Sequence, residues 1–158
     1  METAYESPED LSTRYRLLGM FMALCANSPF GEGTLLDAFR TINSALDAET
    51  FAVYLDEKGR PTAGVLWAWL SEECAERYVE EGCLRDRSDW TSGNQLWLIY
   101  AIASGDQLRQ VAADFRGDRF AGHTEAFMLR PMSDGTNRVV RFTRKGANLL
   151  RRVPKSGG

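Results

Sequence analysis

Few side chains in this sequence could carry nucleophilic or acid–base chemistry. His123 is the only histidine, and there are three cysteines, Cys25, Cys74 and Cys83. An odd number of cysteines without metal-ligand spacing indicates free thiols in a reducing compartment, and the apolar helical face around Cys25 is typical of a core residue. A cysteine nucleophile needs a neighbouring base, and one imidazole is thin support for such a pair. We therefore expect no metal site and interpret His123 as a surface or structural residue.

Fingerprints of bound cofactors are also missing from the sequence. It contains no P-loop and no glycine-rich dinucleotide motif. The segment Ser104-Gly105-Asp106 puts a carboxylate where an acetyl-CoA enzyme would bind pyrophosphate at a helix N-terminus. The sequence therefore predicts no cofactor, and acetyl-CoA is not the expected acyl donor.

Charge is unevenly distributed along the chain. The net charge of −3 argues against nucleic-acid binding by the molecule as a whole. Between residues 138 and 155, however, the charged residues are all basic: Arg138, Arg141, Arg144, Lys145, Arg151, Arg152 and Lys155. Such a run is usually a solvated face, but it could also form a surface for an acidic partner.

Hydrophobic periodicity predicts the elements that must position these residues. The expected helices are 8–25, 35–46, 72–81 and 108–115, and the expected strands are 51–55, 62–70, 96–103, 125–130 and 138–143. Strands 62–70 and 96–103 are apolar on both faces, which predicts interior strands of one sheet. This order favours an α/β (α+β) fold, a mixed sheet with helices packed on it. We expect one domain over residues 1–146, followed by a flexible basic tail at 147–158.

The N-terminal region predicts no export or membrane insertion. The only charged side chains among its first ten residues are the acids Glu2, Glu6, Glu9 and Asp10, whereas a signal peptide starts with basic residues. The apolar stretch 17–26 is too short to span a bilayer. The expected location is therefore the cytoplasm.

One segment has a distinctive order of residues. Asp89-Trp90-Thr91-Ser92-Gly93 is followed by a strand containing Trp97, Ile99 and Ile102-Ala103 and then by Gly105-Asp106. This segment resembles the central block of the RTX toxin-activating lysine acyltransferases, the hemolysin-activator family. Ser28-Pro29, Pro61 and Trp67-Ala68 also match, and the resemblance spans roughly residues 17–144.

The resemblance implies a fold and an activity. Family members have an N-acetyltransferase-like twisted mixed sheet, move a fatty acyl group from acyl carrier protein to a protein lysine, and tend to form dimers. A His after Ser-Pro and an Asp in the central strand act in that transfer. At these two positions the present sequence has Gly31 and Tyr100.

These two residues put the family's chemistry in question. Lysine must lose a proton before it can attack the thioester. Gly31 has no side chain and is interpreted either as part of a flexible Gly-Glu-Gly loop or as a loop recruited for binding. Tyr100, with an ordinary phenol pKa near 10, is a poor base but could protonate a leaving thiolate. Glu32 and Tyr100 are the candidate substitute catalytic residues.

Three functions stay open on the sequence. The first is a catalytically degenerate or altered relative that binds a protein or acyl ligand, and the second is an active acyltransferase using Glu32 or Tyr100. The third, less supported, is a regulator that contacts nucleic acid through the basic C-terminal stretch. The candidate binding residues are Ser28, Arg138, Arg141, Arg144 and Lys145, and acyl carrier protein or another protein is the expected partner, since acyl carrier proteins are strongly acidic.

Overall fold

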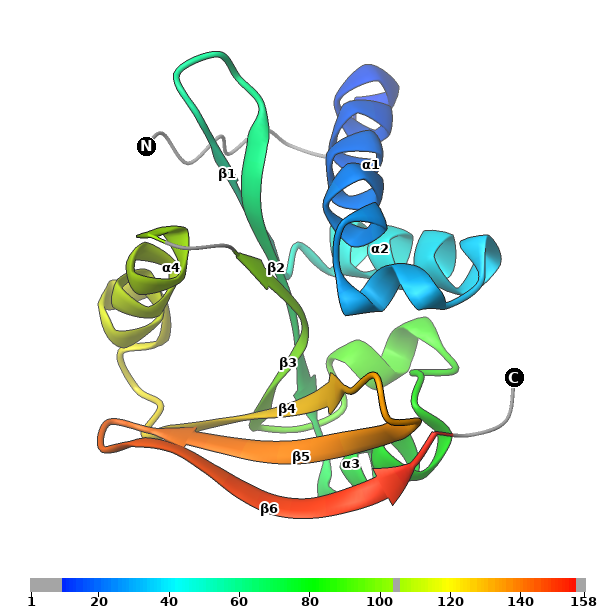
Figure 1. Ribbon diagram of the computed structural model, residues 1–158, viewed down its shortest axis with the longest axis vertical. Helices are drawn as coiled ribbons and strands as arrows, with labels where there is room; N and C mark the ends of the chain where they lie inside the picture. The colour runs from blue at the N-terminus through cyan, green and yellow to red at the C-terminus, as the bar shows by residue number, and fades with distance from the viewer. Residues whose placement is uncertain (1–9, 104–105, 156–158) are drawn as a thin grey trace. The chain divides into compact units, whose positions relative to one another are not determined.

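The computed structural model describes residues 10–103 and 106–155, and Figure 1 shows the course of the chain. The helices are α1 (Leu11–Ala26), α2 (Leu35–Ala48), α3 (Glu72–Glu81) and α4 (Asp106–Arg116). The strands are β1 (Phe51–Leu55), β2 (Pro61–Leu70), β3 (Gln95–Ala103), β4 (Glu125–Pro131), β5 (Thr136–Thr143) and β6 (Gly146–Pro154). Three short 3-10 turns complete the described elements: η1 (Pro29–Glu32), η2 (Arg87–Trp90) and η3 (Asp118–Phe120).

The strands form a mixed six-stranded sheet in the order β1-β2-β3-β4-β5-β6. The β1–β2, β4–β5 and β5–β6 pairs are antiparallel, and the β3–β4 pair is parallel. The predicted mixed α/β fold is confirmed and is consistent with an acetyltransferase-like architecture. The interior position predicted for β2 and β3 is also confirmed, because each has a neighbouring strand on both sides.

The chain divides into two compact units. The first comprises the described residues up to Leu66 together with Tyr100–Gly122, and the second comprises Trp67–Ile99 together with the chain from His123 onward. The single domain expected over residues 1–146 stays a prediction.

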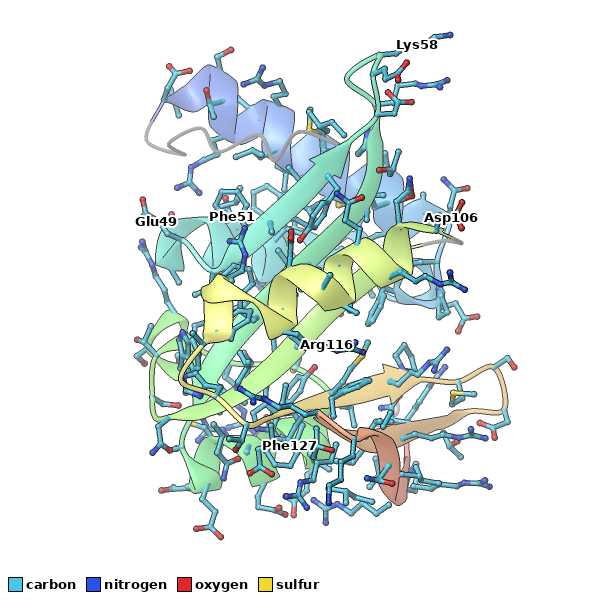
Figure 2. All side chains as sticks on the ribbon, turned by 90° about the vertical axis from the view of Figure 1, so that its left-hand side faces the viewer. Glu49, Phe51, Lys58, Asp106, Arg116 and Phe127 are labelled. Atoms are coloured by element: carbon cyan, nitrogen blue, oxygen red, sulfur yellow. The ribbon has the colours of Figure 1, made fainter. Side chains whose placement is uncertain are left out.

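In the first unit, helices cover both faces of the β1–β2 hairpin. Figures 1 and 2 show α1 and α2 on one face and α4 on the other. On the first face the ring of Phe21 meets that of Phe51 edge to face, with centroids 6.4 Å apart. Gly64 lies here too, and a Cβ on it would come within 2.8 Å of the Phe21 ring. On the opposite face the Tyr54 hydroxyl donates to the Asp114 carboxylate of α4 at 2.6 Å.

The second unit is organised around Trp97 of β3. Tyr78 of α3 meets the Trp97 ring edge to face at 5.7 Å, and Phe127 of β4 stacks on it at 5.2 Å. Arg151 of β6 donates to Glu76 of α3 at 2.9 Å. These contacts place α3 against one face of the β4–β6 strands, as Figure 1 also shows.

The C-terminal segment differs from the expected flexible tail. Gly146–Pro154 forms β6, which pairs antiparallel with β5 from Thr143↔Gly146 to Thr136↔Pro154. Nearly all residues of β6 are exposed. Backbone hydrogen bonds to β5 rather than burial therefore hold this strand, and its sequence lacks the apolar alternation that would have predicted it. Residues 156–158 of the expected tail lie outside the described residues.

Candidate functional site

Within the first unit, the structure places Phe30, the residue before Gly31, against Tyr100. The rings of Phe30, in η1, and Tyr100, in β3, lie with their centroids 4.6 Å apart and their planes inclined by 40°. Gly31 is therefore next to the residue that contacts Tyr100. The site consists of the 28–32 turn, Tyr100 and the neighbouring part of α2.

Ser28 shapes the turn that carries Gly31. Its hydroxyl accepts a hydrogen bond from the Phe30 backbone N–H at 3.3 Å and donates one to the Cys25 carbonyl at 3.0 Å. The Gly31 backbone N–H donates to the Ser28 carbonyl at 3.0 Å. Ser28 thus caps the turn, and a binding role for it stays a prediction.

Gly31 has a steric reason to be glycine. A Cβ at this position would lie 2.5 Å from the Cys25 carbonyl oxygen and 3.3 Å from the Ala26 Cα. Both neighbours are backbone atoms, so relief requires the turn itself to move. Gly31 lies in a hydrogen-bonded 3-10 turn packed against the end of α1, and its interpretation as part of a flexible loop stays a prediction.

Tyr100 is held as a neutral phenol. Burial raises its pKa to about 12, with further contributions from Cys25 and Asp37, while a hydrogen bond with Thr41 of α2 opposes the rise. The hydroxyl therefore stays protonated at neutral pH. A protonated phenol can donate a proton to a leaving group, but it cannot take one from a lysine ammonium.

The remaining titratable side chains near the turn differ in accessibility. Burial raises the pKa of the Cys25 thiol to about 11, so it stays protonated and is not an activated nucleophile. The sequence-based placement of Cys25 in the core is confirmed. Glu32, the other candidate substitute, is exposed directly beside Gly31.

Sequence reasoning missed the residues that surround Tyr100. Phe30 precedes Gly31 in the chain and could have been singled out for that reason. Thr41 lies in a different element, and nothing in the local sequence pairs it with a residue of β3. Only the packing of α2 against the strand makes this contact.

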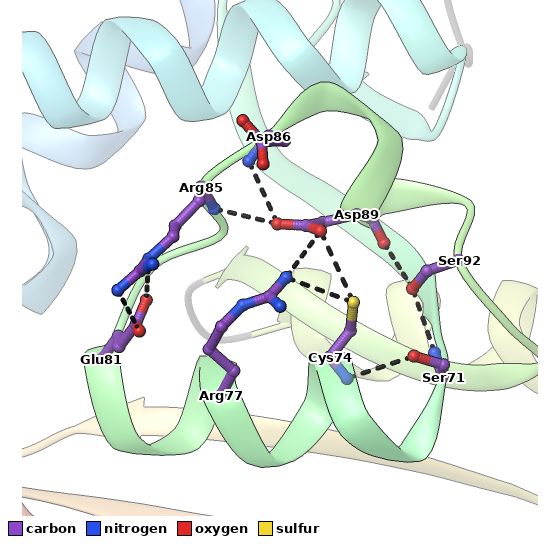
Figure 3. Close-up of polar contacts among 8 residues, drawn as sticks. All are labelled: Ser71, Cys74, Arg77, Glu81, Arg85, Asp86, Asp89 and Ser92. Carbon is purple, nitrogen blue, oxygen red and sulfur yellow. Dashed lines mark hydrogen bonds and ion pairs between the residues drawn. The ribbon is translucent and has the colours of Figure 1, made fainter.

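The Asp-Trp-Thr-Ser-Gly segment belongs to the second unit, and Figure 3 shows the polar contacts of its Asp89. The Asp89 carboxylate is buried. Its Oδ1 accepts from the Arg77 guanidinium at 2.7 Å and from the Cys74 thiol at 3.5 Å. Its Oδ2 accepts the backbone N–H groups of Arg85 and Asp86 at 3.1 and 3.0 Å. This one carboxylate fastens the 85–89 segment to α3.

The last two residues of the segment join β2 to β3. The Ser92 hydroxyl accepts from the Ser71 backbone N–H at 3.0 Å and donates to the Asp89 carbonyl at 2.8 Å. The Gly93 N–H donates to the Trp69 carbonyl at 3.0 Å. A Cβ on Gly93 would lie 2.5 Å from the Leu70 carbonyl oxygen. The motif is therefore a signature of the scaffold rather than of the chemistry.

Comparison with known proteins identifies this scaffold. Residues 11–143 match the RTX toxin acyltransferase family, which is most of the chain. The chain belongs to the RTX toxin acyltransferase family. Membership points to an acyltransferase-type function.

Two relatives show how far the similarity reaches. The lysine-acyltransferase RtxC of Vibrio cholerae serotype O1 is 30% identical over 102 residues, which cover 64% of this chain and 67% of RtxC. The RTX-II toxin-activating lysine-acyltransferase ApxIIC of Actinobacillus pleuropneumoniae is 29% identical over 94 residues, 59% of this chain and 58% of ApxIIC. The aligned region thus spans less than two thirds of ApxIIC.

In this member of the RTX toxin acyltransferase family, the predicted basic binding residues do not share one surface. Arg138 and Arg141 are three residues apart on β5, so their side chains point to opposite faces of the sheet. Arg141 forms an ion pair with Glu125 of β4 at 2.6 Å. Arg144 and Lys145 are exposed in the turn between β5 and β6. A binding role for each stays a prediction.

His123 contacts an aromatic side chain. The His123 ring lies 4.6 Å from that of Trp69, within the second unit. In the described ranges 10–103 and 106–155, no group of three or more His, Cys, Asp and Glu residues could hold a metal ion. Across the same ranges, no helix is long and apolar enough to cross a membrane.

Replacement of Asp89 by Asn is expected to lower the free energy of unfolding by about 1–3 kcal/mol at pH 7, because charge-assisted hydrogen bonds are lost. Burial opposes ionisation of Asp89, but hydrogen bonds from Asp86, Arg77 and Cys74 outweigh it and hold the pKa below its usual range. A carboxylate whose pKa is lower in the folded state than in the unfolded state stabilises the fold at pH values above the unfolded-state pKa, near 3.9. This contribution disappears as the pH falls through the folded-state pKa. The cost of Asp89→Asn should therefore shrink in acid.

Denaturant titrations of wild type and variant at pH 7 and at pH 3–4 measure this. Glu81→Gln is the matched control, because Glu81 is only partly buried and pairs with the exposed Arg85 in the same cluster (Figure 3). An exposed i,i+4 pair contributes only about 0.3–0.5 kcal/mol. Equal effects of the two substitutions would contradict the role given to Asp89.

Proposed function

We propose that this chain is a catalytically degenerate or altered member of the RTX toxin acyltransferase family that acts by binding a protein or acyl ligand, with acyl carrier protein as the expected partner. One observation carries the proposal. Gly31 sits in a turn with no room for a side chain, and Tyr100, whose ring contacts the preceding residue Phe30, stays protonated at neutral pH. Neither position matched by the resemblance therefore holds a base.

The chemical argument rests on the acceptor. A lysine ammonium has an ordinary pKa near 10.4, so at neutral pH it needs a base positioned within hydrogen-bond reach. The family resemblance assigns that task to a His and an Asp. With Gly31 and Tyr100 in their places, recognition of a ligand can persist while deprotonation of the lysine does not.

The second candidate function is acyl transfer with Tyr100 and Glu32 as substitute residues. The Tyr100 phenol carries a proton for the leaving thiolate at neutral pH, but its pKa of about 12 makes it a weaker proton donor than an ordinary phenol. Glu32 is exposed next to Gly31 and could take the lysine proton. Under this alternative, Tyr100→Phe and Glu32→Gln would each slow acyl transfer to an acceptor lysine, which mass spectrometry of the acceptor measures.

The binding part of the proposal has a direct test. Acyl carrier protein is expected to bind at low salt, partly through the exposed β5–β6 turn with Arg144 and Lys145, and to bind less tightly as salt screens the charges. Isothermal titration calorimetry at low and high salt measures this. The variant Arg144→Glu/Lys145→Glu should weaken binding and flatten the salt dependence.

A matched control uses another hairpin turn. Lys58→Glu/Arg60→Glu reverses the same number of charges in the β1–β2 turn and should leave the affinity unchanged. Absence of binding at low salt, or an equal loss in both double variants, would contradict a carrier-binding turn.

The other expectations from the sequence belong to the same proposal. They are a homodimer, implied by the resemblance, and a cytoplasmic location. A nucleic-acid-binding role through the basic stretch has less support, because Arg141 and Arg151 of that stretch form ion pairs with Glu125 and Glu76.

A further inference from the structure

Three arginines from separate strands form a row across one face of the second unit. Strand register pairs Arg130 of β4 directly with Arg138 of β5, and Arg138 directly with Arg152 of β6. Directly paired residues on neighbouring strands point to the same face, and adjacent strands lie about 4.8 Å apart. The three side chains therefore start within about 10 Å of each other.

This row lies on the face of the strands away from α3. Arg151 reaches Glu76 of α3, and its neighbour Arg152 must point the other way because side chains alternate along a strand. Arg152 and Arg130 are exposed, whereas Arg138, in the middle, is partly buried. The row is thus open to solvent at both ends.

The row has little compensating negative charge. Among residues 10–103 and 106–155, no ion pair joins Arg130, Arg138 or Arg152 to an acid, and the buried Nε of Arg138 has no hydrogen-bond partner. The Asp134 carboxylate interacts electrostatically with the row. Hydrogen bonds from Thr136 and, to a smaller extent, the positive charges of Arg138 and Arg152 hold the pKa of Asp134 below its usual range. Like charges directly opposite each other destabilise a sheet, so this arrangement favours a bound anion.

We propose that Arg130, Arg138 and Arg152 form a binding site for a phosphate monoester dianion. Guanidinium groups bind phosphate and carboxylate oxygens in a two-pronged geometry, and the charge distinguishes the two ligands. The three guanidinium groups and the Asp134 carboxylate leave two positive charges, which a phosphate monoester balances with its charge of about −1.5 to −2. A single carboxylate would leave the row half compensated.

The test measures binding of inorganic phosphate and of a phosphoserine peptide to the full chain by calorimetry at pH 7.5, with ionic strength fixed by chloride. Arg152→Gln and Arg130→Gln are each expected to lower the affinity for both ligands by about tenfold or more, since each removes charge-assisted hydrogen bonds. Arg138→Gln should abolish binding. If that partly buried substitution prevents folding, the two exposed positions still decide the result.

Arg151→Gln is the matched control, because it removes the same charge from the adjacent residue on the opposite face and should leave phosphate affinity unchanged. In phosphate-free buffer, Arg152→Gln should melt no lower than wild type, since it relieves repulsion within the row. A merely structural arginine would give the opposite result, and a lower melting temperature would count against the proposal.

The ligands also distinguish the source of the phosphate. Tighter binding of the phosphoserine peptide assigns the site to a phosphorylated protein, and equal or tighter binding of inorganic phosphate assigns it to a small phosphate ligand. The proposal is overturned if neither ligand binds, or if Arg152→Gln and Arg151→Gln bind phosphate equally well. None of these outcomes depends on acyl carrier protein binding.

Discussion

Acylation of an acceptor lysine by this chain is expected to be about 10²–10⁴-fold slower than acylation by a relative that retains the family's His and Asp, since that is the usual contribution of general acid–base catalysis. The reason is the absence of a base at both matched positions. Gly31 has no side chain, and burial raises the pKa of Tyr100 to about 12. The measurement is a time course by mass spectrometry with acyl-loaded carrier protein and a lysine-bearing acceptor.

The two matched positions differ in whether the structure has room for the family's catalytic side chain. Gly31→His is not expected to restore activity alone, because its Cβ would meet the Cys25 carbonyl at 2.5 Å and force the turn to move. Tyr100→Asp places a carboxylate at the site without such a backbone conflict and is the better first substitution. Circular dichroism of each variant controls for folding.

Rapid acylation by the wild type would contradict the proposal that this chain is a catalytically degenerate family member. Its loss in Tyr100→Phe or in Glu32→Gln would then identify the substitute residue. No activity in wild type followed by activity in Tyr100→Asp or in the Gly31→His/Tyr100→Asp variant would show that ligand binding persists without the base.

Trp67→Ala is expected to lower the free energy of unfolding by about 3–5 kcal/mol, the usual cost of truncating a buried tryptophan. Trp67 is 5% exposed in the interior strand β2. Its removal leaves a cavity that the surrounding structure fills only in part. Urea denaturation with the slope of the transition compared between proteins measures the change.

Trp69→Ala is the control, because it removes the same side chain two residues further along the same strand and from the same face. Trp69 is only partly buried, although its ring contacts His123. Its truncation should therefore cost clearly less than that of Trp67. Equal losses would mean that burial along β2 does not follow the observed pattern.

Local sequence patterns were sufficient for much of the framework. Both β2 and β3 were predicted as interior strands because apolar residues occupy both of their faces. The helix predicted over residues 35–46 is present as α2, and Thr34 caps it by accepting the Asp37 backbone N–H at 3.1 Å. The Asp89–Gly93 motif indicated the family before any geometry was known, and the structure supplies the reason for that order of residues in the contacts of Asp89, Ser92 and Gly93.

The C-terminal strand could not be predicted in the same way. β6 has exposed residues along nearly its whole length, so no burial pattern marks it in the sequence. Its strand conformation depends on backbone hydrogen bonds that β5 supplies. The arginine row depends on the same pairing, because Arg152 joins Arg130 and Arg138 only when β6 is in register.

The sequence by itself determined the order of helices and strands, the interior strands and the family resemblance, because these depend on periodicity, caps and a contiguous motif. Only the tertiary structure decided that Gly31 must be small, that burial raises the pKa of Tyr100 above that of an ordinary phenol, and that three arginines from separate strands share one face. Each of these properties depends on residues distant in the chain: the end of α1 beside Gly31, Thr41 beside Tyr100, and strand register for the arginines. Close approach and burial between separate segments are set by packing, which has no local signature in the chain.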